Sequence, residues 1–165
     1  MIVMLMGPAA SGKTTIGEAL SAKMGWQFVD GDLLHPEENI RKMAAGIPLT
    51  DVDRQGWLKA VHDLMSDWQA AGQSGVIACS ALKRAYREEL EVGKLCKVAY
   101  LKVSRPVLLS RLEHRHGHYM HANMLDSQLD ILEEPEENKG IVTVVDGELP
   151  VGEIVSQIIA RLELG

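Results

Sequence analysis

Cysteine is scarce in this chain, which has only two, Cys79 and Cys96, among its 165 residues. Both stand next to apolar segments, and no metal-binding spacing links them. A disulfide framework and a cysteine-ligated metal site are therefore not expected. We predict two buried thiols in a reducing compartment, with the cytoplasm as the expected location.

Long apolar runs are absent as well. No stretch approaches the ~20 apolar residues that cross a membrane, so no membrane partner is expected. The apolar residues 2–6 follow no basic leader and lead directly into a glycine-rich loop, which predicts a first strand rather than a signal peptide. Repeats, low-complexity tracts and linkers are also missing, and the length suits a single domain over residues 1–165.

Positive charge is in deficit: 17 Lys and Arg residues stand against 23 Asp and Glu residues, a formal net charge of −6. Nucleic acid is therefore not expected as the main partner, because a phosphate backbone needs a basic face. Basic residues do cluster at Lys83 and Arg84 and at Arg111 and Arg115. Such clusters suit either a small anionic ligand or an ordinary solvated surface.

The clearest short motif that is present is G-x-x-x-x-G-K-[ST] at residues 7–14. The residues before it predict a buried strand, and residues 13–24 after it predict a helix. In that context the backbone N–H groups of the loop face phosphate oxygens, Lys13 reaches the β- and γ-phosphates, and Thr14 ligates Mg²⁺. A glycine-rich turn that binds nothing is the weaker interpretation. The predicted triphosphate-binding residues are Gly7, Pro8, Ala9, Ala10, Ser11, Gly12, Lys13, Thr14 and Thr15.

Strand and helix signals alternate after this loop. Apolar runs at residues 27–30, 75–79, 97–103 and 141–146 predict strands. Apolar stripes over residues 57–68 and 151–162 predict helices that pack on a sheet. The predicted fold class is therefore α/β, a parallel sheet with helices on both faces, and ligands should bind beyond the carboxyl ends of its strands. Residues 31–54 and about 111–135 should emerge on that side.

Two carboxylates, Asp30 and Asp32, follow the second predicted strand. One could hold Mg²⁺ or its water shell while the other deprotonates and orients an attacking hydroxyl, and Asp32 is the better candidate for this base. A turn that uses Asp and Gly for their backbone preferences explains the same residues. Further on, Arg54 suits a carboxylate because it offers two donors, whereas a lone His35 is more typical of an ordinary loop.

Less specific candidates lie further along the chain. Ser80 could contact phosphate or acceptor together with Lys83, or it could be the N-cap of a helix. Arg111 and Arg115 are spaced to share one helix face, where they could neutralise charge on a transferred phosphoryl group or simply be solvated. The histidines at 114, 116, 118 and 121 match no compact zinc pattern, so no metal is expected there.

A longer pattern is more specific than the phosphate loop. Residues 30–43 contain a Gly-Asp-x-x-His-Pro run, which a nucleotide kinase would lack. Supporting positions are residues 46–54, 57–58, 79–83, 86–87, 100–101, 111–112, 115, 117–118, 124–125, 128, 132–133 and 135. With these segments the chain resembles, over nearly its whole length, the gluconate kinase (gluconokinase) family of phosphate-loop small-molecule kinases.

The resemblance implies ATP-dependent phosphorylation of D-gluconate at its 6-hydroxyl, giving 6-phospho-D-gluconate by in-line transfer with Mg²⁺ and an Asp base. It also implies a three-layer P-loop kinase fold with a five-stranded parallel sheet, a mobile lid at about residues 111–135, and a homodimer. The implied catalytic residues are Lys13, Asp32 and Arg115, with Thr14 and Asp30 at the metal and Arg111 on the nucleotide. The residues implied to hold gluconate are Asp32, His35, Arg54, Lys83, Arg115 and His118.

The chain departs from the family pattern in two places. The loop interior is Pro8-Ala9-Ala10, where the family usually has a Ser- and Gly-richer sequence, and Pro8 removes one N–H donor. We still expect ATP binding, because these positions contribute mainly backbone groups. In the lid, His116 and the pair at residues 119–120 replace residues that are commonly Lys and aromatic.

Three alternative functions are open to such a chain. The first is a related kinase with another small acceptor, such as shikimate or a nucleoside monophosphate. The second is a nucleotide-binding module without catalysis. The third, a GTPase-like switch, is disfavoured because the D-x-x-G match at residues 53–56 follows no apolar strand and residues 138–141 lack the Asp of N-K-x-D.

Overall fold

A five-stranded, all-parallel sheet with the strand order β2-β3-β1-β4-β5 is the framework of the chain. The computed structural model describes residues 1–115 and 122–165. The strands are β1 (Ile2–Met6), β2 (Gln27–Asp30), β3 (Gly75–Ala78), β4 (Lys97–Lys102) and β5 (Val142–Asp146). All five predicted strands are confirmed, each with bounds within one residue of the apolar run that predicted it.

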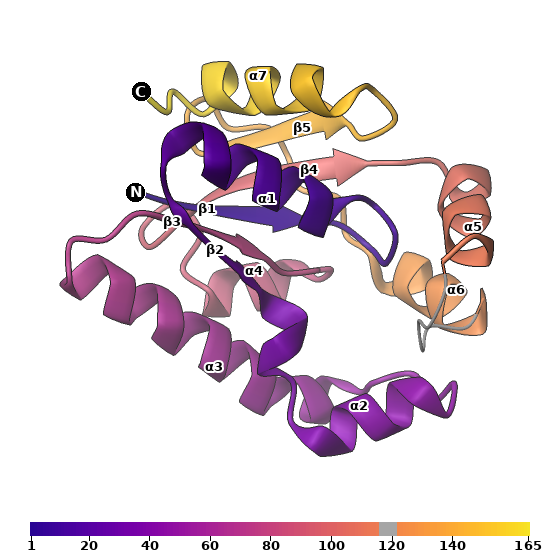
Figure 1. Cartoon of the computed structure of the whole chain (residues 1–165). Helices are drawn as coiled ribbons and strands as arrows, with labels where there is room; N and C mark the ends of the chain where they lie inside the picture. Colours follow the sequence, from indigo (N-terminus) through magenta and orange to yellow (C-terminus); the bar gives the residue numbers. More distant parts are fainter. Residues whose placement is uncertain (116–121) are drawn as a thin grey trace.

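Helices cover both faces of this sheet (Figure 1). The helices of the described residues are α1 (Lys13–Met24), the short 3-10 helix η1 (Gly31–Leu34), α2 (Glu37–Ala44), α3 (Asp51–Ala70), α4 (Arg84–Glu89), α5 (Arg105–Glu113), α6 (Ala122–Ile131) and α7 (Val151–Arg161). Helices α1 and α7 pack on one face, and α3 and α4 on the other. The predicted α/β class and its three layers are confirmed.

The alternation of side chains along β1 explains why both faces are covered. Val3 and Leu5 point into the cluster that includes α1 and α7, whereas Met4 and Met6 point into the cluster that includes α3 and α4. All four side chains are fully buried. Burial of such a side chain contributes about 1.5–3 kcal/mol, so the central strand is held firmly from both sides. The phosphate loop that follows it therefore starts from a rigid position.

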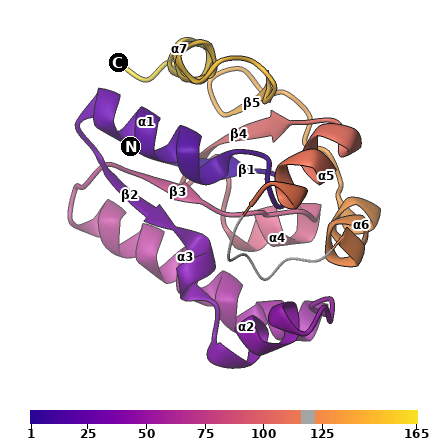
Figure 2. The ribbon, with the colours of Figure 1, turned by 45° about the vertical axis from the view of Figure 1, so that its right-hand side comes forward.

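The segments beyond the carboxyl ends of the strands form one side of the molecule. Figure 2 shows α2, α5 and α6 gathered there, apart from the helices that cover the sheet. Residues 31–54 emerge on this side, as predicted, through η1, α2 and the start of α3. Among residues 1–115 and 122–165, no helix combines the length and apolarity needed to cross a membrane.

Two local predictions are wrong. Ser80 is not a helix N-cap, because the next helix begins only at Arg84, with Lys83 as its N-cap. Ala81 separates them with a φ of 46°, a left-handed conformation that cannot start a right-handed helix. Arg115 does not share a helix face with Arg111, because α5 ends at Glu113. The D-x-x-G match at residues 53–56 lies inside α3 and is not a switch loop.

Candidate active site

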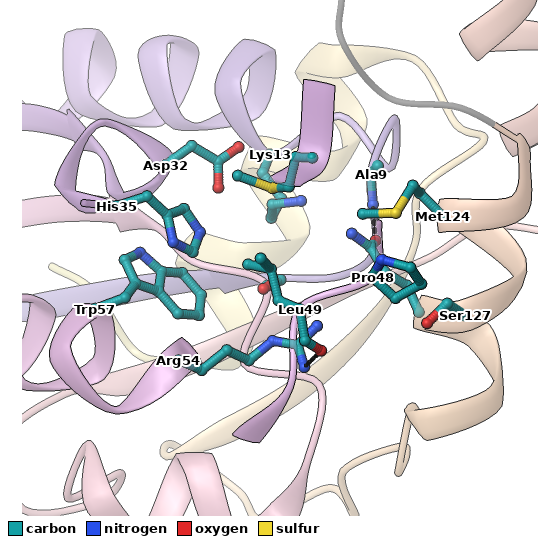
Figure 3. A pocket seen from close by; sticks show the side chains of 13 residues that line it. Ala9, Lys13, Asp32, His35, Pro48, Leu49, Arg54, Trp57, Met124 and Ser127 are labelled. Atoms are coloured by element: carbon teal, nitrogen blue, oxygen red, sulfur yellow. Dashed lines mark hydrogen bonds between the residues drawn. The ribbon is translucent and has the colours of Figure 1, made fainter. Parts of the chain in front are cut away.

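One cavity joins the phosphate loop to the segments that emerge beyond the strands (Figure 3). Lys13 and Asp32 lie at one end of it, His35 and Trp57 stand along one wall, and Arg54 closes the other end. Helix α6 completes the lining on the opposite side. The lining residues are Ala9, Lys13, Asp32, His35, Met43, Pro48, Leu49, Arg54, Trp57, Ser80, Met124, Ser127 and Gln128.

The phosphate loop has the shape that its motif predicts. Gly12 turns the chain with a φ of 98°, and α1 starts at the next residue, so that the helix N-terminus opens toward the loop. The Lys13 ammonium donates to the carbonyls of Gly7 (2.9 Å) and Pro8 (3.0 Å). Burial lowers the pKa of Lys13, and the charges of Asp32 and Asp30 oppose that shift. The Lys13 side chain thus lies against the loop and is held there by two carbonyl oxygens.

Arg111, in the last turn of α5, forms a hydrogen bond to this loop. Its guanidinium donates to the carbonyl of Ala10 and to that of Gly147, both at 3.0 Å. Ala10 has a φ of 65°, a left-handed conformation that residues other than glycine adopt at a cost of roughly 1–2 kcal/mol. Arg111 therefore braces a strained turn of the phosphate loop and brings a positive charge beside it.

The Asp30-Gly31-Asp32 turn leads from β2 into η1, α2 and the start of α3, residues 31–57, which we call the acceptor segments because the acceptor is expected there. One carboxylate oxygen of Asp30 accepts from the Thr14 hydroxyl (3.1 Å), and the other accepts from the backbone N–H of Asp32 (3.0 Å). A Cβ on Gly31 would lie 2.3 Å from the carbonyl oxygen of Ala78, so only glycine fits there. The backbone interpretation of this turn is therefore confirmed at Gly31, while the roles of Asp30 at a metal and of Asp32 as a base stay predictions.

Asp32 lines the cavity, and its surroundings raise its pKa. Loss of water raises its pKa and the charge of Asp30 adds to the rise, while the cations Lys13 and Arg115 oppose it. A carboxylate with a raised pKa is a better proton acceptor than an ordinary one. Arg115 lies beyond the end of α5, yet close enough to act electrostatically on both Lys13 and Asp32.

His35 and Arg54 form the part of the cavity farther from the phosphate loop. The His35 ring stacks on Trp57 with the centroids 4.3 Å apart and the planes 14° from parallel. Arg54 is 7% exposed and donates through Nη1 to the carbonyl of Leu49 (2.8 Å) and the hydroxyl of Tyr86 (3.3 Å). In residues 1–115 and 122–165, Nε and Nη2 of Arg54 have no hydrogen-bond partner, which leaves a two-donor edge for an anionic ligand.

The sequence is similar to those of known kinase families. The shikimate kinase family model matches residues 9–163. A gluconokinase from Gluconobacter oxydans is 39% identical over 162 residues, which cover 98% of this chain and 90% of the relative. The chain belongs to the gluconokinase family.

Solved structures agree with this membership. A sugar kinase from a Janibacter species superimposes with a TM-score of 0.91 at 37% identity, covering 99% of this chain and 95% of its own. A gluconokinase from Sinorhizobium meliloti superimposes with a TM-score of 0.84 at 41% identity, covering 98% and 90%. The phosphate loop, the sheet and the acceptor segments described above therefore belong to one fold that gluconokinases share.

Not every residue that the family resemblance suggested lies in the cavity. Lys83 instead forms an ion pair with Asp51 (2.9 Å) and lies above the Tyr86 ring at 5.7 Å. It is outside the cavity lining. His118 lies outside the described residues, as do the lid positions 116 and 119–120. The gluconokinase motif thus brings Lys13, Asp32, His35 and Arg54 together, and a contact of Lys83 or His118 with the acceptor stays a prediction.

Sequence reasoning missed three residues of the site. Trp57 belongs to the apolar stripe that predicts packing on the sheet, but it also stacks on His35 and donates to the carbonyl of Gly31 (2.8 Å). Gln128 accepts from the backbone N–H of Ala9 (2.8 Å), which joins α6 to the phosphate loop. Asn39 bonds His35 at 3.1 Å. His35 precedes α2, which begins at Glu37, so helical spacing alone does not predict the contact with Asn39.

Mg²⁺ is the metal that gluconokinases of this fold would need, and the residues present fit it. The Thr14 hydroxyl and the Asp30 carboxylate are adjacent oxygen donors, the ligands that Mg²⁺ prefers. No group of three or more His, Cys, Asp or Glu side chains suited to a metal occurs in the described part of the chain. The remaining ligands would therefore be water and phosphate oxygens, as is usual for Mg²⁺ with a nucleotide.

Proposed function

We propose that this chain transfers the γ-phosphoryl group of ATP to the 6-hydroxyl of D-gluconate, giving 6-phospho-D-gluconate and ADP. The observation that carries the proposal is the 39–41% identity to gluconokinases over nearly the whole chain. The cavity supports it, because a phosphate loop and polar groups suited to a hydroxylated anion face the same space.

Asp32 is the proposed base. It takes the proton of the acceptor hydroxyl as that oxygen attacks the γ-phosphorus in line with the leaving oxygen of ADP. One P–O bond forms, the bond to the β-phosphate oxygen breaks, and the proton ends on the Asp32 carboxylate. The raised pKa of Asp32 suits this role, since a base of very low pKa would accept a proton poorly.

The cations around the loop would stabilise the charge of the transferred group. Lys13 would move from the carbonyls of Gly7 and Pro8 to the phosphate oxygens, and Arg111 and Arg115 would lie on the nucleotide side. Thr14 and Asp30 would hold Mg²⁺, which when bound neutralises phosphate charge. Residues 111–135 would form a lid that closes over both substrates.

Arg54 and His35 would hold gluconate. The free edge of the Arg54 guanidinium suits the carboxylate of an aldonic acid, and burial leaves that ion pair largely unscreened by water. His35 would contact a hydroxyl, and Lys83 and His118 are further proposed contacts. A homodimer in the cytoplasm is the assembly and location that we propose from the family resemblance.

A second acceptor class deserves the same test, because the shikimate kinase family model matches residues 9–163. A coupled assay of ADP release should therefore compare gluconate with other aldonic acids, shikimate and nucleoside monophosphates. We expect gluconate alone to stimulate ATP consumption strongly. Stimulation by a different acceptor, with none by gluconate, would reject the substrate but keep the kinase class.

Two variants test the catalytic assignments within this assay. Lys13→Ala and Asp32→Asn should each lower kcat by roughly 100-fold or more, because each removes a group that acts on the reacting atoms. Lys23→Ala on the same helix and Asp67→Asn on α3 make the matched changes at exposed positions and should keep full activity. Full turnover by Asp32→Asn would reject Asp32 as the base. A nucleotide-binding module would instead bind ATP and release no ADP with any acceptor.

A further inference from the structure

The orientation of the His35 ring is defined by two neighbours. Trp57 covers one face of the ring, with the centroids 4.3 Å apart (Figure 3). Asn39 meets one edge, with its Nδ2 atom 3.1 Å from Nδ1 of His35. His35 is 9% exposed and lines the cavity. Neither translation nor rotation of the ring is possible without loss of one of these contacts.

The direction of the Asn39–His35 hydrogen bond follows from a second contact. Nδ2 of Asn39 also lies 2.8 Å from the backbone carbonyl oxygen of Asp53, and a carbonyl can only accept. The amide nitrogen therefore faces both partners and donates one hydrogen to each. Nδ1 of His35 must be the acceptor, and in a neutral imidazole the proton then sits on Nε2.

Asp53, whose backbone carbonyl accepts from Asn39, is held by several contacts of its own. Asp53 closes a capping box with Thr50 at the start of α3, and its carboxylate pairs with Lys42 of α2 at 2.8 Å. Asn39 is 3% exposed, so water cannot easily compete for its hydrogens. The junction of α2 and α3 thus holds a rigid amide donor against the histidine.

The charges around His35 favour the neutral ring. Burial lowers its pKa to about 4, the positive charge of Arg54 on α3 adds to this, and Asp30 at the end of β2 opposes it. The other charged groups that line the same cavity are Lys13 on α1 and Asp32 in η1. At neutral pH the ring is therefore uncharged, and a hydrogen bond at Nδ1 decides which nitrogen carries the proton.

We propose that Asn39 is a positioning residue, which holds His35 in the Nε2–H tautomer so that the cavity offers a neutral N–H donor to an oxygen of the acceptor. In residues 1–115 and 122–165, Nε2 of His35 has no partner, and it is the ring nitrogen left for a ligand. Only the contact with the acceptor rests on the proposed function. The tautomer is a property of the protein without substrate, and can be measured there.

The first experiment is two-bond ¹⁵N–¹H NMR correlation of the imidazoles at pH 7.5, with His35→Gln to assign the His35 signals. We expect the Nε2–H pattern in the unsubstituted protein. An Nδ1–H pattern would overturn the proposal whatever the substrate is. This measurement needs no variant of Asn39, so it remains decisive even if such variants do not fold.

The second experiment changes the partner of Nδ1. In Asn39→Asp a carboxylate accepts from Nδ1–H, so we expect the opposite tautomer and a raised His35 pKa; Asn39→Ala should give a mixture. Asn138→Asp makes the same change far from the cavity and should leave the His35 signals as they are. Retention of the Nε2–H pattern in Asn39→Asp would show that Asn39 does not set the tautomer.

Steady-state kinetics with gluconate then test the contact itself. Asn39→Asp should raise KM for gluconate roughly tenfold, the factor expected for one lost hydrogen bond, with kcat and KM for ATP within about threefold. A reversed tautomer with unchanged KM would reject the acceptor contact. Absence of gluconate turnover in the unsubstituted protein would reject the proposed function, while the NMR result would still decide the tautomer.

Discussion

The phosphate loop and the acceptor segments face each other across one cavity, but they hold their functional groups by different means. On the donor side, residues 7–15 present backbone N–H groups, a helix N-terminus and one lysine from a continuous segment, and only Arg111 comes from elsewhere in the chain. The acceptor side, formed by His35, Asn39, Arg54 and Trp57, presents side chains from three separate elements. The donor side is suited to any triphosphate, whereas the acceptor side can select one small molecule.

This difference matters for tolerance to substitution. The Pro8-Ala9-Ala10 interior of the loop departs from the family pattern, yet Gly12 keeps its turn and Lys13 its position. On the acceptor side each functional side chain depends on another: His35 on Trp57 and Asn39, and Arg54 on Tyr86. We therefore expect substitutions on the acceptor side to alter KM for gluconate and to leave ATP binding nearly unchanged.

The largest expected effect concerns Asp32, where the two sides meet. Below the pKa of this carboxyl the base is protonated, so kcat at saturating substrates should fall about tenfold for each pH unit. Burial raises that pKa above the ordinary 3.8, which moves the fall to higher pH. Direct measurement of 6-phosphogluconate at pH values from 4 to 8 checks this, and a flat profile would reject Asp32 as the base.

A control must separate loss of chemistry from loss of fold at low pH. The hydrogen bond from Lys42 lowers the pKa of Asp53 to about 2, below its unfolded value of about 3.8. Its contribution to stability is therefore fully present above the unfolded value and is lost only as pH falls toward 2. Circular dichroism at each pH is still needed, because the folded pKa of His35, about 4, lies below its unfolded value of 6.5, so this residue removes stability as pH falls from 6.5 toward 4.

A smaller effect is expected for Arg54→Lys, on the acceptor side alone. Lysine cannot bond Leu49 and Tyr86 and still present two donors to a carboxylate, so KM for gluconate should rise roughly 10- to 100-fold. KM for ATP should stay within about twofold. The matched control is Arg84→Lys, an exposed arginine whose side chain forms an ion pair with Glu88 at 3.4 Å.

An equal rise of both KM values in Arg54→Lys would contradict the separation of the two sides. Such a result would indicate that the substitution changes the whole cavity, for example by moving Asp32 as well as the acceptor. Steady-state kinetics with one substrate varied and the other saturating distinguish the two results.

The donor side was predictable from the sequence because its function needs only local information. A strand, a glycine loop and a helix in succession define the phosphate loop, and the structure has Gly12 and Lys13 where the motif requires them. The five strands followed in the same way from short apolar runs. Errors arose where a single backbone angle decided the outcome, as at Ala81, whose left-handed turn delays α4 to Arg84.

The acceptor side was predictable only in part, because its contacts join segments far apart in the chain. His35 and Arg54 were expected at the site, and they line the cavity. The ion pair of Lys83 with Asp51 was not foreseen, since spacing does not reveal which of several acids a lysine meets. Trp57 shows a further limit: an apolar stripe predicts burial, but it cannot show that a buried ring also supports a histidine.

Helix α6 contacts both the donor side and the acceptor side of the cavity. Met124 packs with Met43 and Leu49 of the acceptor segments, while Gln128 accepts from the N–H of Ala9 in the phosphate loop. A nucleotide that uses this N–H must first replace the amide oxygen of Gln128. The helix therefore contacts both the phosphate loop and the cluster of Met43 and Leu49.

Gln128→Ala tests that link and should have the smallest effect. Removal of the competing acceptor should tighten binding of a non-hydrolysable ATP analogue by about two- to fivefold, the range for one modest hydrogen bond partly replaced by water. Isothermal titration calorimetry measures it, with Gln69→Ala on the exposed side of α3 as the control. Weaker binding would instead mean that Gln128 helps to hold the nucleotide-binding form of the loop, and α6 would then belong to the donor side.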